Sequence, residues 1–305
     1  MKLIMNRKTA IRSVSLTAPA KVNLCLSVLG PRSDGFHELL TLMAKIDLCD
    51  LVTLERTEAK GETSCICVGE DGLDGKENLA WRAVELWRQA TGDDSGFRIT
   101  IKKRIPAMAG LGGGSSDAVA TLKALNFWNL APLPIEELNE IATQLGSDCP
   151  GFLVDGACVA SGRGEEVRPL SKEANDRLDG KRLILFKPPI GFSTAAVYSG
   201  LNQKEDGYSS RESAYQRIEA WEKGEADPEE LMTNDLEGVV LSKYIFVRPL
   251  FDILFRHFGV RSMLSGSGSC CFAFVPDNCP VHEVFGFVKD AWGHGAFVAH
   301  QQIRS

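Results

Sequence analysis

One stretch decides how this chain is interpreted: Pro106-Ala107-Met108-Ala109-Gly110-Leu111-Gly112-Gly113-Gly114-Ser115-Ser116-Asp117. Four glycines fall within five positions of it, so no side chains cover the backbone N–H groups there. An expected strand over 98–102 precedes the stretch, and an expected helix over about 115–129 follows it. Because a helix begins with free N–H groups and a positive dipole end, the stretch is a predicted anion site suited to a triphosphate.

Two better-known phosphate motifs do not fit this stretch. No Gly-Lys-Ser/Thr follows the four-residue gap of a P-loop, and the dinucleotide pattern started at Gly110 ends on Ser115 instead of glycine. The plain alternative is a flexible hinge followed by a serine-capped helix. A strand before the glycine run and a capped helix after it favour a phosphate loop over that hinge.

Composition bounds the remaining possibilities. A chain of 305 residues with 44% hydrophobic and 24% charged residues is expected to fold into two domains of about 150 residues each. The net charge of −6 argues against nucleic-acid binding. Nine cysteines without a C-x-x-C pair indicate reduced thiols and a cytoplasmic protein. The first 14 residues are basic and lack a long apolar run, so neither a signal peptide nor a membrane span is expected.

The pattern along the chain predicts an α+β fold, because strands and helices alternate in no strict βαβ order. In residues 21–29, Val22, Leu24, Leu26 and Val28 alternate with polar or small residues, so one face should pack and the other can face a cleft. A polar segment over 171–179 shows no pattern and predicts a boundary between domains 1–174 and 175–305. Strands are expected at 14–17, 21–29, 51–56, 63–68, 98–102, 157–161, 182–186, 262–264 and 270–275, and helices at 78–90, 115–129, 136–145, 195–201, 214–223 and 249–258.

The glycine-rich stretch resembles the phosphate loop of the GHMP kinases, the superfamily of galactokinase, homoserine kinase and mevalonate kinase. Residues 19–24 resemble the first motif of that superfamily, and residues 264–268 resemble its third, a glycine turn beside the phosphate loop. The resemblance implies a two-domain GHMP kinase fold with the active site in the cleft between the domains. It also implies ATP and Mg²⁺ as cofactors.

Further motifs resemble one family within the superfamily, the 4-diphosphocytidyl-2-C-methyl-D-erythritol kinases. They are residues 19–24, 32–39, 145–150, 188–195 and 234–237, and the resemblance extends from about residue 17 to about residue 275. It implies ATP-dependent phosphorylation of the 2-hydroxyl of this cytidine-diphosphate-linked sugar alcohol, a step of the non-mevalonate route to isoprenoid precursors. Rival interpretations are another GHMP kinase, of homoserine or mevalonate type, and a nucleotide-binding protein without turnover.

The resemblance assigns two catalytic residues. Asp148 matches the base that takes the proton of the acceptor hydroxyl, and Lys21 matches the lysine that pairs with this base and the transferring phosphate. A carboxylate beside a cation stays ionised, which fits such a role. Two plain alternatives stay open: Asp148 may cap the segment that starts at Pro150, and Lys21 may be a solvated strand residue.

The resemblance also assigns binding residues. His37 would read the cytosine edge, Phe36 and Tyr198 would stack on the base, and Asn23 and Thr194 would hold the sugar alcohol or phosphates. His37 could instead be a loop residue without a ligand. Phe36, Met43 and Gly151 depart from the family pattern, which often has tyrosine at the first position and an aromatic residue at the other two. The expected ATP-binding residues are Pro106, Ala107, Met108, Ala109, Gly110, Leu111, Gly112, Gly113, Gly114, Ser115 and Ser116.

The metal ligands stay unknown, because the sequence contains no clear carboxylate cluster. Phosphates and water are expected to hold most of the Mg²⁺ coordination shell. The partner is expected to be a small-molecule substrate, with no nucleic acid and no membrane, and the chain is expected to be a monomer or a weak homodimer.

Overall fold

The computed structural model describes residues 13–129, 131–203 and 207–304. Its central element is a long antiparallel pair, β1 (Ser13–Pro31) and β2 (His37–Thr57). We expected two strands at 14–17 and 21–29, but β1 is one strand. A register shift between Pro19 and Lys21 lets the chain pass the proline without ending the strand.

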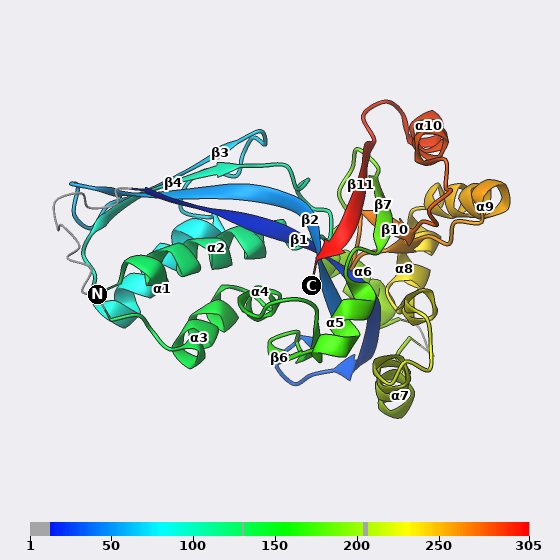
Figure 1. Cartoon of the computed structure of the whole chain (residues 1–305), viewed down its shortest axis with the longest axis horizontal. Helices are drawn as coiled ribbons and strands as arrows, with labels where there is room; N and C mark the ends of the chain where they lie inside the picture. Colours follow the sequence, from blue (N-terminus) through cyan, green and yellow to red (C-terminus); the bar gives the residue numbers. More distant parts are fainter. Residues whose placement is uncertain (1–12, 130, 204–206, 305) are drawn as a thin grey trace, which may run out of the picture.

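The sheet around this pair contains eleven strands among the described residues, and Figure 1 shows it running through the whole molecule. Its main path follows the order β3-β4-β2-β11-β7-β10-β9, and β1 and β5 also pair with β2. The other strands are β3 (Thr63–Val68), β4 (Gly96–Lys102), β5 (Cys158–Gly162), β6 (Glu166–Pro169), β7 (Arg182–Lys187), β8 (Thr233–Asn234), β9 (Met263–Leu264), β10 (Cys271–Phe274) and β11 (Phe297–Arg304).

In the first half, four helices lie on one face of β1 to β4 (Figure 1). Trp87, Leu122 and Phe97 are fully buried between these helices and the sheet. Asn78 caps the first helix, because its side chain accepts a hydrogen bond from the Ala80 N–H group. These helices are α1 (Leu79–Thr91), α2 (Gly113–Trp128), α3 (Ile135–Leu145) and α4 (Cys149–Leu153).

The second half packs its helices around β7 and β10, where Phe186, Leu250 and Trp292 form part of the core. A third cluster, which includes Leu42 and Leu183, joins the two halves. The helices are α5 (Lys172–Leu178), α6 (Thr194–Leu201), α7 (Arg211–Glu222), the 3₁₀-helix η1 (Pro228–Leu231), α8 (Glu237–Lys243), α9 (Val247–Phe258) and α10 (Val281–Trp292).

The C-terminal strand β11 joins the two halves of the sheet. It pairs with β7 along residues 297–302 and with β2 at Ile303 and Arg304. The sequence analysis missed both β11 and α10, which follow the last expected element. Its residue types give no alternating pattern, because three apolar residues are followed by His300, Gln301 and Gln302, although burial alternates along the second part of the strand.

Two further expectations were wrong in detail. The segment 171–179 is a short helix, α5, whose Ser171 hydroxyl accepts from the Ala174 N–H group; its two buried residues are too few to show a pattern. On β1, both faces are largely buried around Lys21 to Val28, but Lys21 and Asn23 still line a cavity, as expected of the polar face. The α+β fold is confirmed. The division into residues 1–174 and 175–305 stays a prediction.

Candidate active site

The phosphate loop lies between β1 and the glycine turn at 265–268. The Lys21 N–H group donates to the Leu111 carbonyl (2.9 Å), and the Ser265 hydroxyl donates to the Gly110 carbonyl (3.0 Å). Gly110 has φ +71°, and a Cβ there would lie 2.1 Å from the Ser265 carbonyl oxygen. A side chain at 110 would therefore push the loop off the turn. Contacts on both sides disfavour the hinge alternative.

The helix after the loop begins without a side-chain cap. Gly112 occupies the N-cap position of α2 with φ +69°, and no side chain accepts from the first N–H groups. A Cβ at Gly112 would lie 2.9 Å from Phe152 and 3.1 Å from Lys21. The glycine thus allows close packing against these residues and leaves the helix N-terminus open to an anion.

A buried charge network holds both ends of the loop. Lys103 Nζ donates to Asp50 (2.5 Å) and to Asp117 in the first turns of α2 (2.7 Å). Asp50 also accepts from the N–H groups of Arg104 (2.5 Å) and Ile105 (2.9 Å), where the loop begins. Burial, and to a lesser extent the neighbouring carboxylate of Asp50, raise the pKa of Asp117 to about 7, although the Lys103 ammonium lowers it. The sequence analysis missed this network.

Lys21 and Asp148 lie together, as the resemblance implies. Lys21 Nζ lies 3.4 Å from Asp148 Oδ2 and donates to Asn23 Oδ1 (2.7 Å), and Asn23 donates in turn to Thr41 (2.9 Å). Lys21 is 3% exposed, so it is not a solvated strand residue. Asp148 is the N-cap residue of α4, but its side chain makes no capping hydrogen bond, and it is 42% exposed. Its carboxylate therefore remains available to a ligand.

A cavity of 720 Å³ opens beside this pair. On its wall, His37 lies against Tyr198 with ring centroids 4.9 Å apart, and His37 Nε2 is 2.6 Å from Asn202 Oδ1. Thr194 and Ser267 face each other with their hydroxyls 2.8 Å apart. All seven expected catalytic and acceptor-binding residues line this cavity: Lys21, Asn23, Phe36, His37, Asp148, Thr194 and Tyr198.

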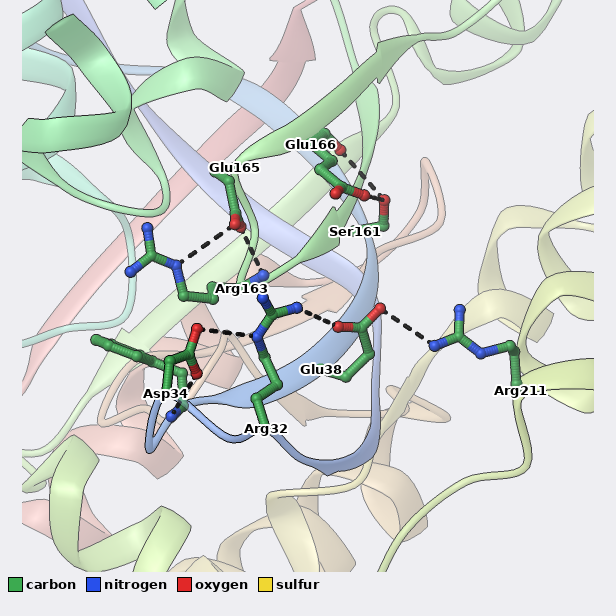
Figure 2. Close-up of polar contacts among 9 residues, drawn as sticks. Arg32, Asp34, Glu38, Ser161, Arg163, Glu165, Glu166 and Arg211 are labelled. Atoms are coloured by element: carbon green, nitrogen blue, oxygen red, sulfur yellow. Dashed lines mark hydrogen bonds and ion pairs between the residues drawn. The ribbon is translucent and has the colours of Figure 1, made fainter. Parts of the chain in front are cut away.

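Phe36 forms part of the rim of this cavity, and its ring is 51% exposed. The Arg163 guanidinium lies over it, 4.8 Å from the ring centroid. The Phe36 N–H group donates to Asp34 (3.1 Å), and this bond, more than the ion pair with Arg32, lowers the pKa of Asp34. Figure 2 shows how ion pairs tie this turn to Glu38, with Arg32 on one side and Arg211 on the other.

A second cavity of 420 Å³ lies on the other side of the phosphate loop and is lined by Asn78. Gly110 and Ser115 line both cavities, so the two meet at the loop. The expected ATP-binding residues from Pro106 to Ser115 all line the second cavity. Ser116 does not: it is 1% exposed and faces the opposite side of α2.

Several cavity residues were missed by the sequence analysis. Asn202, the C-cap residue of α6, follows Tyr198 by four residues, so helical spacing could have placed it on the same side. Arg163 lies between two glycines after β5, and nothing in the sequence marks that turn as part of a cavity. Thr41 has no signal, whereas Met43 and the glycine turn with Gly266 and Ser267 stand out in the sequence without an expected place in the cavity.

Two departures from the family pattern contact each other. A Cβ at Gly151, in α4, would lie 2.0 Å from Met43 Cε, while Met43 is 3% exposed and lines the first cavity. The methionine therefore fills the space that a side chain at 151 would occupy. In this chain the two residues form one packing unit between the cavity and the helix that carries Asp148.

The described residues contain no group of three or more His, Cys, Asp or Glu side chains that could hold a metal ion. None of the helices in those residues combines the length and the apolarity needed to cross a membrane.

Family models match both halves of the chain. The model described as "GHMP kinases N terminal domain" matches residues 78–162, and "GHMP kinases C terminal" matches residues 217–294. Curated relatives named 4-diphosphocytidyl-2-C-methyl-D-erythritol kinase are similar over most of their length. The protein of Pelotomaculum thermopropionicum is 40% identical over 87% of this chain and 90% of its own, and that of Brevibacillus brevis is 37% identical over 92% and 94%.

Solved structures agree with these relatives. A crystal structure of a 4-(cytidine 5'-diphospho)-2C-methyl-D-erythritol kinase has a TM-score of 0.73 and 34% identity, and covers 95% of this chain and 99% of that one. The homoserine kinase of Cytophaga hutchinsonii has a TM-score of 0.72 at 17% identity, with 98% of each chain covered. This second likeness concerns the fold alone.

The charge network predicts a pH dependence of stability. The Asp117 carboxyl binds its proton more tightly in the folded state, so its contribution is complete below pH about 4 and is lost as pH rises through about 7. Over this window the free energy of unfolding should fall by up to about 1.4 kcal/mol per pH unit relative to Asp117→Asn. Urea unfolding at several pH values measures this, with the exposed Asp94→Asn as control. Parallel curves for wild type and Asp117→Asn would contradict the prediction.

The contact of Gly151 with Met43 predicts that the effect of Gly151→Ala on stability has opposite signs in wild type and in Met43→Ala. In wild type, Gly151→Ala should destabilise by up to about 1 kcal/mol, because its Cβ displaces Met43 Cε, the end of a flexible side chain that borders the first cavity. In Met43→Ala, the same change should be neutral or stabilise by about 0.5–1 kcal/mol, because alanine favours the helix. Urea unfolding of the four proteins gives the coupling. Equal effects in both backgrounds would show that the residues act independently.

Proposed function

The chain belongs to the family of the 4-diphosphocytidyl-2-C-methyl-D-erythritol kinases within the GHMP kinases, and we propose that it transfers the γ-phosphate of ATP to the 2-hydroxyl of that substrate. The observation that carries this proposal is the place of the Lys21–Asp148 pair. It lies in a cavity that meets the phosphate-loop cavity at Gly110 and Ser115. An acceptor in one cavity and a nucleotide in the other would meet at this pair.

The chemistry follows from these positions. Asp148 accepts the proton of the acceptor hydroxyl, and the hydroxyl oxygen forms a bond to the γ-phosphorus of ATP. The bond from that phosphorus to the oxygen shared with the β-phosphate breaks, and ADP leaves. Lys21 compensates the negative charge of the transferring phosphoryl group. Asn23 and Thr41 orient Lys21 through the hydrogen-bond chain that ends on the Cys25 carbonyl.

The nucleotide would bind along Pro106 to Ser115. Gly110 and Gly112 leave the backbone uncovered, and the uncapped start of α2 suits the phosphates. Mg²⁺ fits this site with few protein ligands: the Ser115 hydroxyl and the Asp148 carboxylate line the same cavity and offer oxygen donors. Bound there, Mg²⁺ would neutralise phosphate charge.

The acceptor would bind in the 720 Å³ cavity. His37 is held by Asn202 at the cavity wall and can offer its ring to the cytosine edge. Tyr198 and Phe36 offer ring faces, and the Arg163 guanidinium lies over one face of Phe36. Thr194 and Asn23 remain the proposed contacts for the sugar alcohol and its phosphates. The acidic net charge supports a small-molecule partner and argues against nucleic acid.

We also propose a cytoplasmic enzyme that acts as a monomer or weak homodimer. All nine cysteines are free thiols, which suits a reducing compartment. Among the rival interpretations, a binding protein without turnover does not account for Asp148, whose side chain makes no capping hydrogen bond and pairs with Lys21 in the cavity. A homoserine or mevalonate kinase does not account for the aromatic wall around His37.

Asp148→Asn should reduce turnover by about 10²- to 10⁴-fold, because the amide cannot accept the proton. A coupled ADP-release assay with ATP, Mg²⁺ and 4-diphosphocytidyl-2-C-methyl-D-erythritol measures this. The exposed Asp94→Asn makes the same substitution far from the cavity and should keep wild-type turnover. No turnover of wild type with this acceptor, but turnover with homoserine or mevalonate, would favour the rival kinases. Nucleotide binding without any turnover would favour the binding protein.

Tyr198→Leu should raise the KM for the acceptor by roughly 5- to 150-fold, because the loss of one stacking face costs about 1–3 kcal/mol. Leucine keeps an apolar side chain, so the half-buried position should stay packed. The KM for ATP should change little, because Tyr198 lines the acceptor cavity and does not line the phosphate-loop cavity. Equal rises in both KM values would point to a general loss of structure.

A further inference from the structure

A separate cavity of 520 Å³ lies behind the active site, between the sheet, α2 and the C-terminal end of α4. We name it the rear cleft, and it shares no lining residue with the two cavities described above. The C-terminal end of β11 pairs with β2 in this region (Figure 1). The rear cleft is lined by Thr17, Pro19, Lys45, Ser116, Val119, Ala120, Lys123, Phe152, Val154, Asp155, Gly156 and Arg304.

Three cations stand side by side across the sheet at this point. Lys45 on β2 is directly opposite Lys21 on β1 and directly opposite Arg304 on β11. Like charges at directly opposed positions destabilise a sheet. Lys21 has Asp148 as its counter-charge, and among the described residues Arg304 has only a distant one, Asp47 at 3.9 Å. Lys45 forms no ion pair with any described residue.

The burial of Lys45 makes this missing counter-charge costly. Lys45 is 8% exposed and donates to a single acceptor among the described residues, the Val154 carbonyl. Burial, and to a lesser extent the neighbouring Lys123 ammonium, lower the pKa of Lys45 to about 8 despite the carboxylate of Asp155. An ammonium group has three donors, so two of them have no partner in the described part of the chain. A buried cation of this kind is normally paired.

Two neighbouring groups on α2 also lack a partner in the described part of the chain, although Lys123, unlike Lys45, is an exposed residue whose remaining donors water can reach. Lys123 donates to the Phe152 carbonyl (2.8 Å) and forms no ion pair with a described residue, and burial lowers the pKa of this lysine as well. The Ser116 hydroxyl is buried and has no hydrogen-bond partner among the described residues. The rear cleft thus gathers unpaired ammonium donors and an unpartnered hydroxyl, with Asp155 as its one lining carboxylate.

We propose that the rear cleft binds a small anion that carries a phosphate or diphosphate group, held by Lys45, Lys123, Ser116 and Arg304. Such an anion supplies the counter-charge that the cation row lacks and accepts the free donors of both lysines. The apolar side of the cleft, with Val119, Phe152 and Val154, leaves room beyond one phosphate. The group could therefore come from the free inorganic ion or from a phosphate ester of a small metabolite.

Binding should be linked to proton uptake. Six titratable or charged groups face or surround Lys45: Lys123, Arg304, Asp155, Asp47, Cys158 and Lys21. The pKa of the Cys158 thiol is raised to about 11 by burial, so it stays neutral. An anion favours the charged form of Lys45, so at pH 8 the complex should take up a fraction of a proton. Affinity should fall as pH rises above about 8.

Isothermal titration calorimetry tests the proposal on the full chain saturated with ADP. Inorganic phosphate, inorganic diphosphate and glycerol 3-phosphate serve as separate probes and distinguish the free ion from an ester. We expect one site per chain for at least one probe. Lys45→Met and Lys123→Met should each weaken it by about tenfold or more, and Ser116→Ala should weaken it by several-fold. At pH 8, two buffers of different ionisation enthalpy should reveal proton uptake in wild type and none in Lys45→Met.

Two control variants locate the binding. Lys187→Met removes another buried lysine that donates only to carbonyls and lines none of the three cavities, and it should bind like wild type. Lys21→Met reports on binding in the active site. Loss of binding in Lys21→Met with retention in Lys45→Met would overturn the proposal, as would no binding of any probe up to about 10 mM. If Lys45→Met fails to melt cooperatively, Lys123→Met and Ser116→Ala decide the outcome.

Discussion

The hydrogen bonds of Lys103 to Asp50 and Asp117 are the constraint on which the site depends. They close a ring around the phosphate loop, because Asp50 holds the backbone where the loop begins and Asp117 belongs to the helix where it ends. A buried network of this kind contributes little net stability, since desolvation opposes the attraction of the charges. Its contribution is geometric, because it fixes both ends of a loop whose glycines would otherwise leave the backbone flexible.

A fixed loop is what phosphoryl transfer needs. The protein does no covalent chemistry in such a reaction, so its contribution is the placement of charge and hydrogen-bond donors before the nucleotide arrives. The glycine turn at 265–268 holds the loop from the second half of the chain, and the backbone of Lys21 holds it from β1. The loop, the cation and the base are thereby fixed to one another, although they come from three distant parts of the sequence.

This distance explains what the sequence could and could not predict. The glycine-rich loop and the helices α1 and α2 have local signals, namely a glycine run and helical spacing, and the structure confirms a loop followed by α2 and the helix α1. The partners of Lys103, the contact between Met43 and Gly151 and the strand β11 depend on residues far apart in the chain. No local pattern marks them. Ser116 shows the limit within a motif, since the residue beside Ser115 points to the opposite side of the helix.

Asp148 precedes a very short helix, and lysines of the rear cleft hold the far end of that helix. This helix, α4, has five residues and is too short to be stable alone. The Asp148 side chain does not cap that helix, whose start is held by the buried Cys149 and by the hydrogen bond from its N–H group to the Gly146 carbonyl. The opposite end is held as well: Lys123 and Lys45 donate to the carbonyls of Phe152 and Val154. The lysines that lack a counter-charge therefore help to hold the base in place, and whatever neutralises them acts on the far end of the same helix.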